Sequence, residues 1–244
     1  AEQLDQMGGE QLKRKIESMG VKVHTSKNTK EIVQEGENAR KTMRFADGSQ
    51  LEIDFIVFST GIRPRDKLAT QCGLEVGQRG GILINDSCQT SDPDIYAIGE
   101  CASWKNRVYG LVAPGYKMAQ VAVDHILGTP NAFQGADMSA KLKLLGVDVG
   151  GIGDAHGRTP GARSYVYLDE SKEVYKRLIV SEDNKTLLGA VLVGDTSDYG
   201  NLLQLALNAI ELPENPDALI LPAHASGGKP SIGVDKLPDS AQIC

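Results

Sequence analysis

The sequence predicts an α/β protein with a small α+β C-terminal domain that is built on an antiparallel sheet. Two helix-like segments, 2–19 and 112–128, are separated by short strand-like runs. From about residue 131 the pattern changes to successive strand-like runs, which suit an antiparallel meander, and then to one helix. Apolar residues make up 41% of the 244 residues and charged residues 24%, which is the balance of a folded globular chain.

The first predicted element is a helix over residues 2–19, and Gly20 follows it as a left-handed stop. Strand-like runs follow at 21–24, 41–45 and 51–59. The last two are joined by an Asp-Gly turn, which predicts a β-hairpin. The apolar residues of the helix recur at helical spacing: Leu4, Met7, Leu12, Ile16 and Met19.

The middle of the chain begins with a loop region at 65–94, which leads through a short strand at 81–84 to a second apolar strand at 95–99. A helix over 112–128 comes next, with Gly128 as its stop. We expect the second domain at 131–211 and an extended, proline-rich linker at 212–244. The strand-like runs of the second domain are 144–153, 164–168, 173–181 and 186–195, and its helix lies across 197–211.

Charge and cysteine content exclude several classes of protein. A net charge of -6 argues against a nucleic-acid-binding or anionic-membrane surface. Four widely spaced cysteines do not form a secreted disulfide framework, so we expect a cytoplasmic protein. Because the chain starts on Ala1 without an initiator methionine and ends on a lone Cys244, we expect an internal fragment of a longer protein.

Three weaker patterns are rejected. Residues 227–231 lack the glycine and hydroxyl positions of a phosphate-binding loop, and residues 150–157 lack the register of a dinucleotide-binding turn. The four histidines have no metal-ligand spacing with one another or with the cysteines. No residue of the chain is singled out as a catalytic acid, base or nucleophile.

The stretch "SDPDIYAIGECAS" at 91–103 carries the main site signature. A strand that ends on Gly99 can bring its backbone close to a ligand, because glycine has no side chain to keep the ligand away. The carboxylate of Glu100 would then face that ligand from the end of the strand. The alternative interpretation is that Glu100 only caps the helix that follows it.

These motifs carry a family resemblance. "TGIRPR" at 60–65 and "DIYAIGECA" at 94–102, followed by a helix that contains "AQ", resemble the pyridine-nucleotide-dependent flavoprotein disulfide-reductase-like family. Longer stretches, such as "INDSCQTSDPDIYAIGECASW" and "GLVAPGYKMAQVAVDHILG", resemble its assimilatory NAD(P)H nitrite reductase branch over essentially the whole chain. The resemblance implies the C-terminal parts of an NAD(P)H-binding domain and an FAD-binding domain, then a small reductase C-terminal domain and a linker toward an iron-sulfur segment: 1–64, 65–130, 131–211 and 212–244.

The resemblance also implies the cofactors FAD and NAD(P)H and a set of binding residues. Glu100 would hold the ribityl hydroxyls of FAD, although most of the wider family carries Asp there. Gly99 would allow the close approach, and a helix amino terminus would face the N1 and C2 carbonyl edge of the flavin. The cofactor-binding residues expected in this way are Thr60, Gly61, Gly99, Glu100, Ala113, Pro114 and Gly115.

The intact protein implied by the resemblance transfers a hydride from NAD(P)H to FAD and then single electrons through iron-sulfur clusters to siroheme, where nitrite becomes ammonia. Its expected partners are a small subunit and a second copy of itself, with no nucleic acid and no membrane. Cys244 would be an iron-sulfur ligand. The glycine-rich pyrophosphate turns are absent from the sequence, so the chain alone is expected to be inactive and to bind no flavin tightly. The alternatives are a ferredoxin- or rubredoxin-type NAD(P)H reductase and a non-catalytic interaction module.

Overall fold

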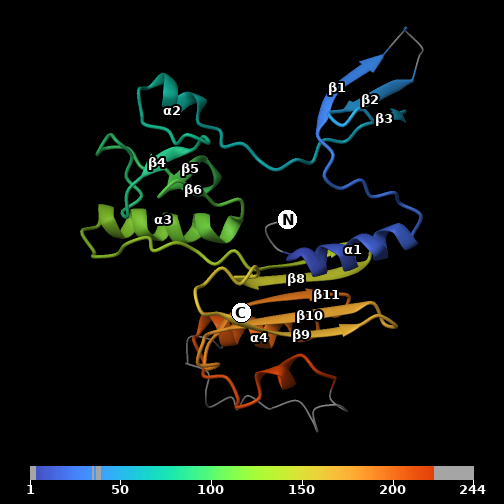
Figure 1. The fold of residues 1–244 in the computed structure, drawn as a ribbon. Coiled ribbons are helices and arrows are strands. Elements are labelled where there is room, and N and C mark those ends of the chain that lie inside the picture. The colour runs from blue at the N-terminus through green and yellow to red at the C-terminus, as the bar shows by residue number, and fades with distance from the viewer. Residues whose placement is uncertain (1–3, 35, 37–39, 223–244) are drawn as a thin grey trace. The chain divides into compact units, whose positions relative to one another are not determined.

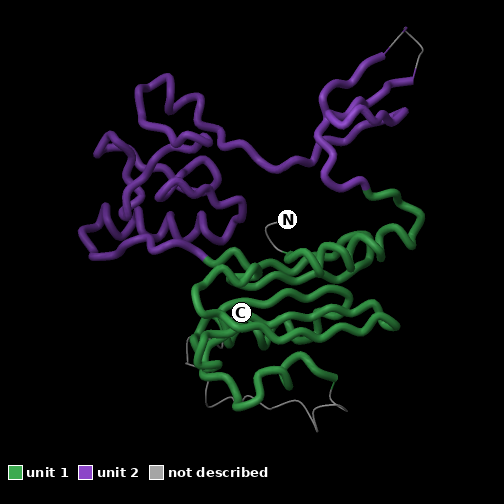
Figure 2. Tube along the Cα trace, in the orientation of Figure 1, with its two compact units in different colours: residues 1–23, 137–244 green, residues 24–136 purple. Residues whose placement is uncertain are grey.

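The structure, a computed structural model, describes residues 4–34, 36 and 40–222 of the chain. These residues form two compact units (Figure 2). Unit 1 combines the described residues up to 23 with those from 137 onward, and unit 2 comprises those between 24 and 136. Unit 1 is therefore built from two separate parts of the sequence.

The core of unit 1 is a five-stranded antiparallel sheet with the strand order β7-β8-β11-β10-β9. It confirms the antiparallel sheet that the sequence predicts, but the sheet is not one continuous meander, because β8 pairs with β11 and not with β9. The first edge strand, β7, lies almost entirely before the first predicted run and pairs with β8. The strands are β7 (Ala140–Leu144), β8 (Val147–Gly153), β9 (Arg163–Asp169), β10 (Val174–Val180) and β11 (Leu187–Val193).

Helices cover both faces of this sheet (Figure 1). On one face, α4 (Tyr199–Leu207) and the short 3-10 helix η2 (Pro216–Leu219) pack against Ala190 and Leu192 of β11. On the other face, α1 (Gln6–Ser18) packs near Val191 and Val193 of the same strand. Because both faces are covered, β11 is an unbroken apolar run rather than an alternating one.

The contact between α1 and the sheet is specific. Asp5 caps α1 by accepting a hydrogen bond from the Gly8 N–H at 3.0 Å, and it also accepts one from the Tyr175 hydroxyl at 2.6 Å. The Arg177 guanidinium pairs with the same carboxylate at 2.9 Å. A Cβ on Gly8 would lie 3.1 Å from Val191 Cγ1, so glycine lets the helix approach closely. The structure thus groups α1 with the C-terminal sheet, whereas the assignment of 1–64 to an NAD(P)H-binding domain stays a prediction.

The expected linker at 212–244 begins as part of the core of unit 1. Leu212, Leu219 and Ile220 are buried against the α4 face of the sheet. The local prolines favour an extended linker, but the burial of these three apolar side chains removes apolar surface from water and stabilises the packed arrangement. Residues 223–244, including Cys244, lie outside the described residues.

A buried ion cluster joins β10 to the start of α4. Lys176 is 3% exposed, and its Nζ contacts Asp195 Oδ2 at 2.6 Å and Asp198 Oδ2 at 2.7 Å. Burial alone would lower the pKa of Lys176, but the two aspartates outweigh it and raise that pKa above its usual value. Burial would likewise raise the pKa of Asp195, but hydrogen bonds from Lys176 and the Ser197 N–H lower it to about 2. Lys176 and Asp195 are therefore both charged at neutral pH.

This cluster predicts an acid-dependent loss of stability. The pKa of Asp195 is lower in the folded chain than the value of about 3.9 expected in the unfolded chain, so its contribution is complete above that value and is lost as the pH falls through about 2. We expect Asp195→Asn to flatten the fall in unfolding free energy between about pH 4 and pH 2. Urea titrations followed by circular dichroism at several acid pH values measure this slope. Equal slopes for the wild type and the variant would contradict the prediction.

Unit 2 contains a three-stranded antiparallel sheet in its first part, with the order β1-β2-β3. The predicted hairpin is confirmed, with Gly48 in the left-handed region at φ +83° between β2 and β3. β1 pairs with β2 but was not among the predicted strands, and the predicted strand at 21–24 is absent from the structure. The strands are β1 (Thr29–Gln34), β2 (Lys41–Phe45) and β3 (Gln50–Ile53).

The predicted strand at 51–59 is only partly correct, because β3 ends at Ile53. Phe55, Val57 and Phe58 follow it with exposed fractions of 80%, 72% and 73%. A strand with such continuous apolar character needs neighbouring strands and covering layers. None of the described strands pairs with this segment.

The remainder of unit 2 is a second small sheet with α3 (Val112–Ile126) beside it. The helix and its stop at Gly128, φ +73°, confirm the sequence prediction. The predicted strand at 95–99 is replaced by one isolated bridge between Gln89 and Tyr96, because no described strand forms a ladder with it. The other elements are α2 (Lys67–Gln71), β4 (Ile82–Ile84), the 3-10 helix η1 (Gly99–Cys101), β5 (Ala102–Trp104) and β6 (Arg107–Val108). No helix among the described residues has the length and apolar character needed to span a bilayer.

Candidate functional site

The candidate site is a cavity of about 330 Å³ where η1 meets the first turns of α3. It is lined by Gly99 and Glu100, which belong to one sequence motif, and by Gly115, which belongs to another. The structure therefore brings together the glycine-carboxylate pair and the start of the helix. The lining residues are Ile98, Gly99, Glu100, Leu111, Val112, Gly115, Tyr116 and Ala119.

Two glycines make the junction between η1 and α3. Gly99 adopts φ +77°, a conformation that favours glycine, although a Cβ there would meet nothing within 4 Å. A Cβ on Gly115 would lie 3.2 Å from the Gly99 Cα, so its absence is what allows the helix to touch the turn. The Gly99 N–H also donates a hydrogen bond to Met118 Sδ at 3.3 Å.

Glu100 lies in the first turn of η1 and contributes to the lining of the cavity. It is exposed, and no ion pair or hydrogen bond within the described part of the chain holds its carboxylate. No side-chain cap hydrogen bond is present at η1, so the alternative interpretation of Glu100 as a helix cap has no support. The carboxylate is free to accept hydrogen bonds from a ligand in the cavity.

The start of α3 has no side-chain cap. Its N-cap residue is Leu111, which has an extended backbone and no side chain able to accept a hydrogen bond. Val112 and Ala113 carry first-turn N–H groups, which lack intrahelical partners, whereas Pro114 has no N–H to leave unpaired. Pro114 is buried and Val112 lines the cavity. This helix end can therefore stabilise negative charge beside the cavity.

Thr60 and Gly61 do not line this cavity. Gly61 adopts φ +101° in a segment without regular structure, which fits a turn. The next residue, Ile62, lies close to Gly110. A Cβ added to Gly110 would be 3.0 Å from Ile62 Cδ1. The segment thus runs past the residues that precede α3, and a role for Thr60 and Gly61 in cofactor binding stays a prediction.

Sequence reasoning missed the helical wall of the cavity. Val112, Tyr116 and Ala119 are spaced at i, i+4 and i+7, and they form a face of α3 separate from the buried residues Pro114 and Met118. Tyr116 is 74% exposed. A helical projection that starts from Gly115 would have identified this wall.

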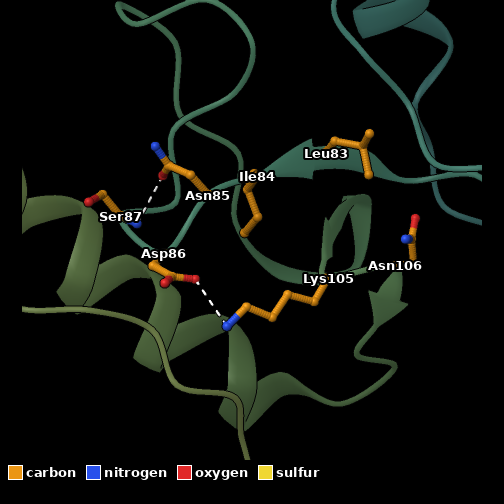
Figure 3. A pocket seen from close by; sticks show the side chains of 7 residues that line it. All are labelled: Leu83, Ile84, Asn85, Asp86, Ser87, Lys105 and Asn106. Atoms are coloured by element: carbon orange, nitrogen blue, oxygen red, sulfur yellow. Dashed lines mark hydrogen bonds and ion pairs between the residues drawn. The ribbon is translucent and has the colours of Figure 1, made fainter.

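A second cavity, of about 540 Å³, lies beside the turn between β5 and β6 (Figure 3). Several of its polar side chains have partners at or beside the cavity. Asp86 accepts a hydrogen bond from Trp104 Nε1 at 2.8 Å and pairs with Lys105 at 3.5 Å. Asn85 Oδ1 accepts one from the Ser87 N–H at 2.9 Å. These contacts stabilise the turn, and none of the predicted site residues lies there.

The part of the chain that the structure describes holds no group of three or more histidine, cysteine or acidic side chains that could bind a metal ion. Cys244 is not among the described residues, so its role as an iron-sulfur ligand stays a prediction. Cys88 is buried, and burial raises its pKa to about 11, which makes it an inert core thiol.

Comparison with known protein families gives two matches. Residues 1–125 match the model of the pyridine nucleotide-disulphide oxidoreductases. Residues 139–210 match the rubredoxin NAD+ reductase C-terminal domain, which corresponds to the antiparallel sheet of unit 1 and to α4.

Individual relatives point the same way. The chain is 91% identical to the NADH nitrite reductase large subunit of Escherichia coli K12, over all of this chain and 29% of that protein. It is 54% identical to the NAD(P)H nitrite reductase large subunit of Klebsiella oxytoca, over all of this chain and 25% of that protein. The chain thus spans less than a third of the length of these relatives.

A solved structure shows the same fold. The ferredoxin reductase for the CYP199A2 system of Rhodopseudomonas palustris superimposes with a TM-score of 0.70 and 18% identity, over 88% of this chain and 52% of that one. The fold is therefore the mixed α/β fold of such reductases, with an antiparallel C-terminal domain.

Proposed function

Because the chain belongs to the pyridine nucleotide-disulphide oxidoreductase family, we propose that it forms part of the flavin reductase portion of an NAD(P)H-dependent nitrite reductase. The family implies FAD and NAD(P)H as cofactors. The large subunits of nitrite reductases support the finer assignment, because they match the chain over its whole length.

The observation that carries the proposal is the cavity in which Gly99, Glu100 and Gly115 meet. Its residues fit a flavin cofactor. A carboxylate without a protein partner suits the hydroxyl groups of a ribityl chain, and Gly99 leaves open space that a Cβ would occupy. FAD, when bound, accepts a hydride from NAD(P)H and releases electrons singly.

Each residue then has a defined task. Glu100 would accept hydrogen bonds from ribityl hydroxyls, and Gly99 would let the backbone approach. The first-turn N–H groups of Val112 and Ala113 would stabilise negative charge on the pyrimidine side of the flavin ring. Thr60 and Gly61 would form the turn through which the chain returns from the nicotinamide-binding part. None of these residues moves a proton.

In the complete protein, electrons would continue through iron-sulfur clusters to siroheme, where nitrite would be reduced to ammonia. A small subunit and a second copy of the large subunit are the proposed partners. Cys244 would be an iron-sulfur ligand at the entry to that part of the protein.

The test uses the full-length protein, purified with its cofactors under anaerobic conditions. We expect NADH to bleach the flavin absorbance, and nitrite to restore it while ammonia accumulates. The match to the rubredoxin NAD+ reductase C-terminal domain favours one alternative, a reductase of small redox proteins. Reoxidation by ferredoxin or rubredoxin but not by nitrite would establish that alternative. If the purified full-length protein contained no flavin, the result would favour the second alternative, a non-catalytic interaction module.

A further inference from the structure

We infer that Met118 is a positioning residue for the FAD site, which acts by fixing the Gly99–Glu100 turn against α3. The inference rests on the proposed function, because it assigns a role in holding the residue that would bind the flavin. Met118 does not line the cavity itself. Its effect must therefore pass through Gly99.

The contact that carries the inference is the hydrogen bond from the Gly99 N–H to Met118 Sδ, at 3.3 Å. Met118 is 0% exposed, so core packing holds its side chain. Gly99 is half-buried, and Glu100 is the next residue in the chain. A fixed sulfur atom on the helix thus holds the peptide group directly before the proposed ribityl ligand.

Glycine makes such an anchor necessary. Gly99 adopts φ +77°, and glycine populates positive and negative φ about equally, so the residue itself does little to define its conformation. Rotation about this residue would change the direction in which Glu100 leaves the turn. The N–H···S contact fixes the orientation of the peptide group between Ile98 and Gly99, from which the chain turns toward Glu100.

Gly115 provides a second restraint from the same helix. It lies three residues before Met118, so both are on the side of α3 that meets η1. A Cβ on Gly115 would come within 3.2 Å of Gly99 Cα. The two contacts hold Gly99 at its Cα and at its nitrogen, and they keep Glu100 in register with the uncapped start of α3.

A leucine at position 118 separates positioning from packing. Leucine fills a similar volume without a hydrogen-bond acceptor, and exchanges of this kind are tolerated well in protein cores. We expect Met118→Leu to leave the melting temperature of the apoprotein within about 3 °C of the wild-type value. The order of the turn, and with it the affinity for FAD, should fall.

The experiment is a double-mutant cycle in the full-length protein with FAD affinity as the readout. FAD is titrated into the flavin-free wild type, Met118→Leu, Glu100→Ala and the double variant. We expect Met118→Leu to weaken FAD binding about three- to tenfold when Glu100 is present. We expect less than a twofold effect in the Glu100→Ala background, because Met118 then has no ligand to position.

Met43→Leu is the matched control. Met43 Sδ also accepts a hydrogen bond, from the Thr29 hydroxyl at 3.6 Å, but it lies on β2 and does not line the cavity. Its replacement should leave FAD affinity unchanged.

Three results would overturn the inference. An equal loss of affinity from Met118→Leu with and without Glu100 would show that Met118 acts independently of the carboxylate. No loss from Met118→Leu, together with a large loss from Glu100→Ala, would remove the role of Met118 and leave the proposed function intact. Unchanged FAD affinity in Glu100→Ala would contradict the proposed flavin site itself, and the inference would fall with it.

Discussion

Replacement of Glu100 with alanine is expected to weaken FAD binding by the full-length protein about a hundredfold. A carboxylate that accepts two hydrogen bonds from ribityl hydroxyls loses both, and each charge-assisted bond of this kind contributes about 1.5–3 kcal/mol. We take the low end of that range because Glu100 is exposed at the rim of the cavity. The dissociation constant of FAD, measured by titration of the flavin-free protein, tests the expectation.

Two further variants define what Glu100 does. Glu100→Asp keeps the negative charge and introduces the residue that most of the wider family carries at this position. We expect this variant to lose no more than about tenfold in FAD affinity. Glu100→Gln keeps a hydrogen-bond acceptor without the charge, so its FAD affinity should lie between those of the aspartate and alanine variants. If alanine and aspartate bound FAD equally well, the carboxylate would have no role in binding.

Replacement of Lys176 with methionine should give the largest loss of stability, about 3–5 kcal/mol. The ammonium group would no longer balance Asp195 and Asp198, whose side chains are 42% and 6% exposed. Most of the effect comes from Asp198, because the removal of an ammonium group from beside a buried carboxylate is costly. Hydrogen exchange of the β10 and β11 amides in the 244-residue chain measures the free energy of opening.

A pair of comparisons tests the cause of that loss. Lys172→Met removes a 63% exposed ammonium 3.6 Å from Asp169 and should change stability by less than about 0.5 kcal/mol. Lys176→Met combined with Asp198→Asn should be more stable than Lys176→Met alone, because the buried side chain that has lost the ammonium group is then neutral. A double variant that is less stable would show that shape rather than charge makes Lys176 important.

The sequence predicts best those elements whose partners lie close by in the chain. The strands β8, β9, β10 and β11 of unit 1 coincide with predicted runs because their apolar patterns are strong, whereas β7 lies almost entirely before the first of those runs. The helix 112–128 is equally well marked, since Gly128 ends it and its buried positions recur at helical spacing. Local pattern and final structure agree in these segments.

Predictions failed where pairing depends on distant residues. The runs 55–59 and 95–99 have strand-like composition, but a strand forms only when a neighbour satisfies its backbone groups. The docking of α1 on β10 and β11 also escaped prediction, because Asp5 and Tyr175 are far apart in sequence. A pattern of residues cannot show which distant surface a helix will meet.

The candidate site was predicted in part for the same reason. Glu100 and Gly99 are adjacent, so their motif is visible in the sequence. The contact of Gly99 with Gly115 and Met118 depends on how α3 packs, and no local signal reveals it. The sequence therefore indicated three residues that line the cavity, Gly99, Glu100 and Gly115, but not Met118, whose sulfur accepts a hydrogen bond from Gly99.

The two-part construction of unit 1 has a consequence for synthesis on the ribosome. α1 is synthesised before the strands of its sheet, and residues 24–136 must all be made between α1 and the first of those strands. During this interval the apolar side of α1 is open to chaperones and to aggregation, because translation is slow compared with helix formation. The cap at Asp5 can form at once, whereas the bonds to Tyr175 and Arg177 must wait for β10. Slower translation across 24–136 should therefore prolong the exposure of the helix and lower the yield of native protein.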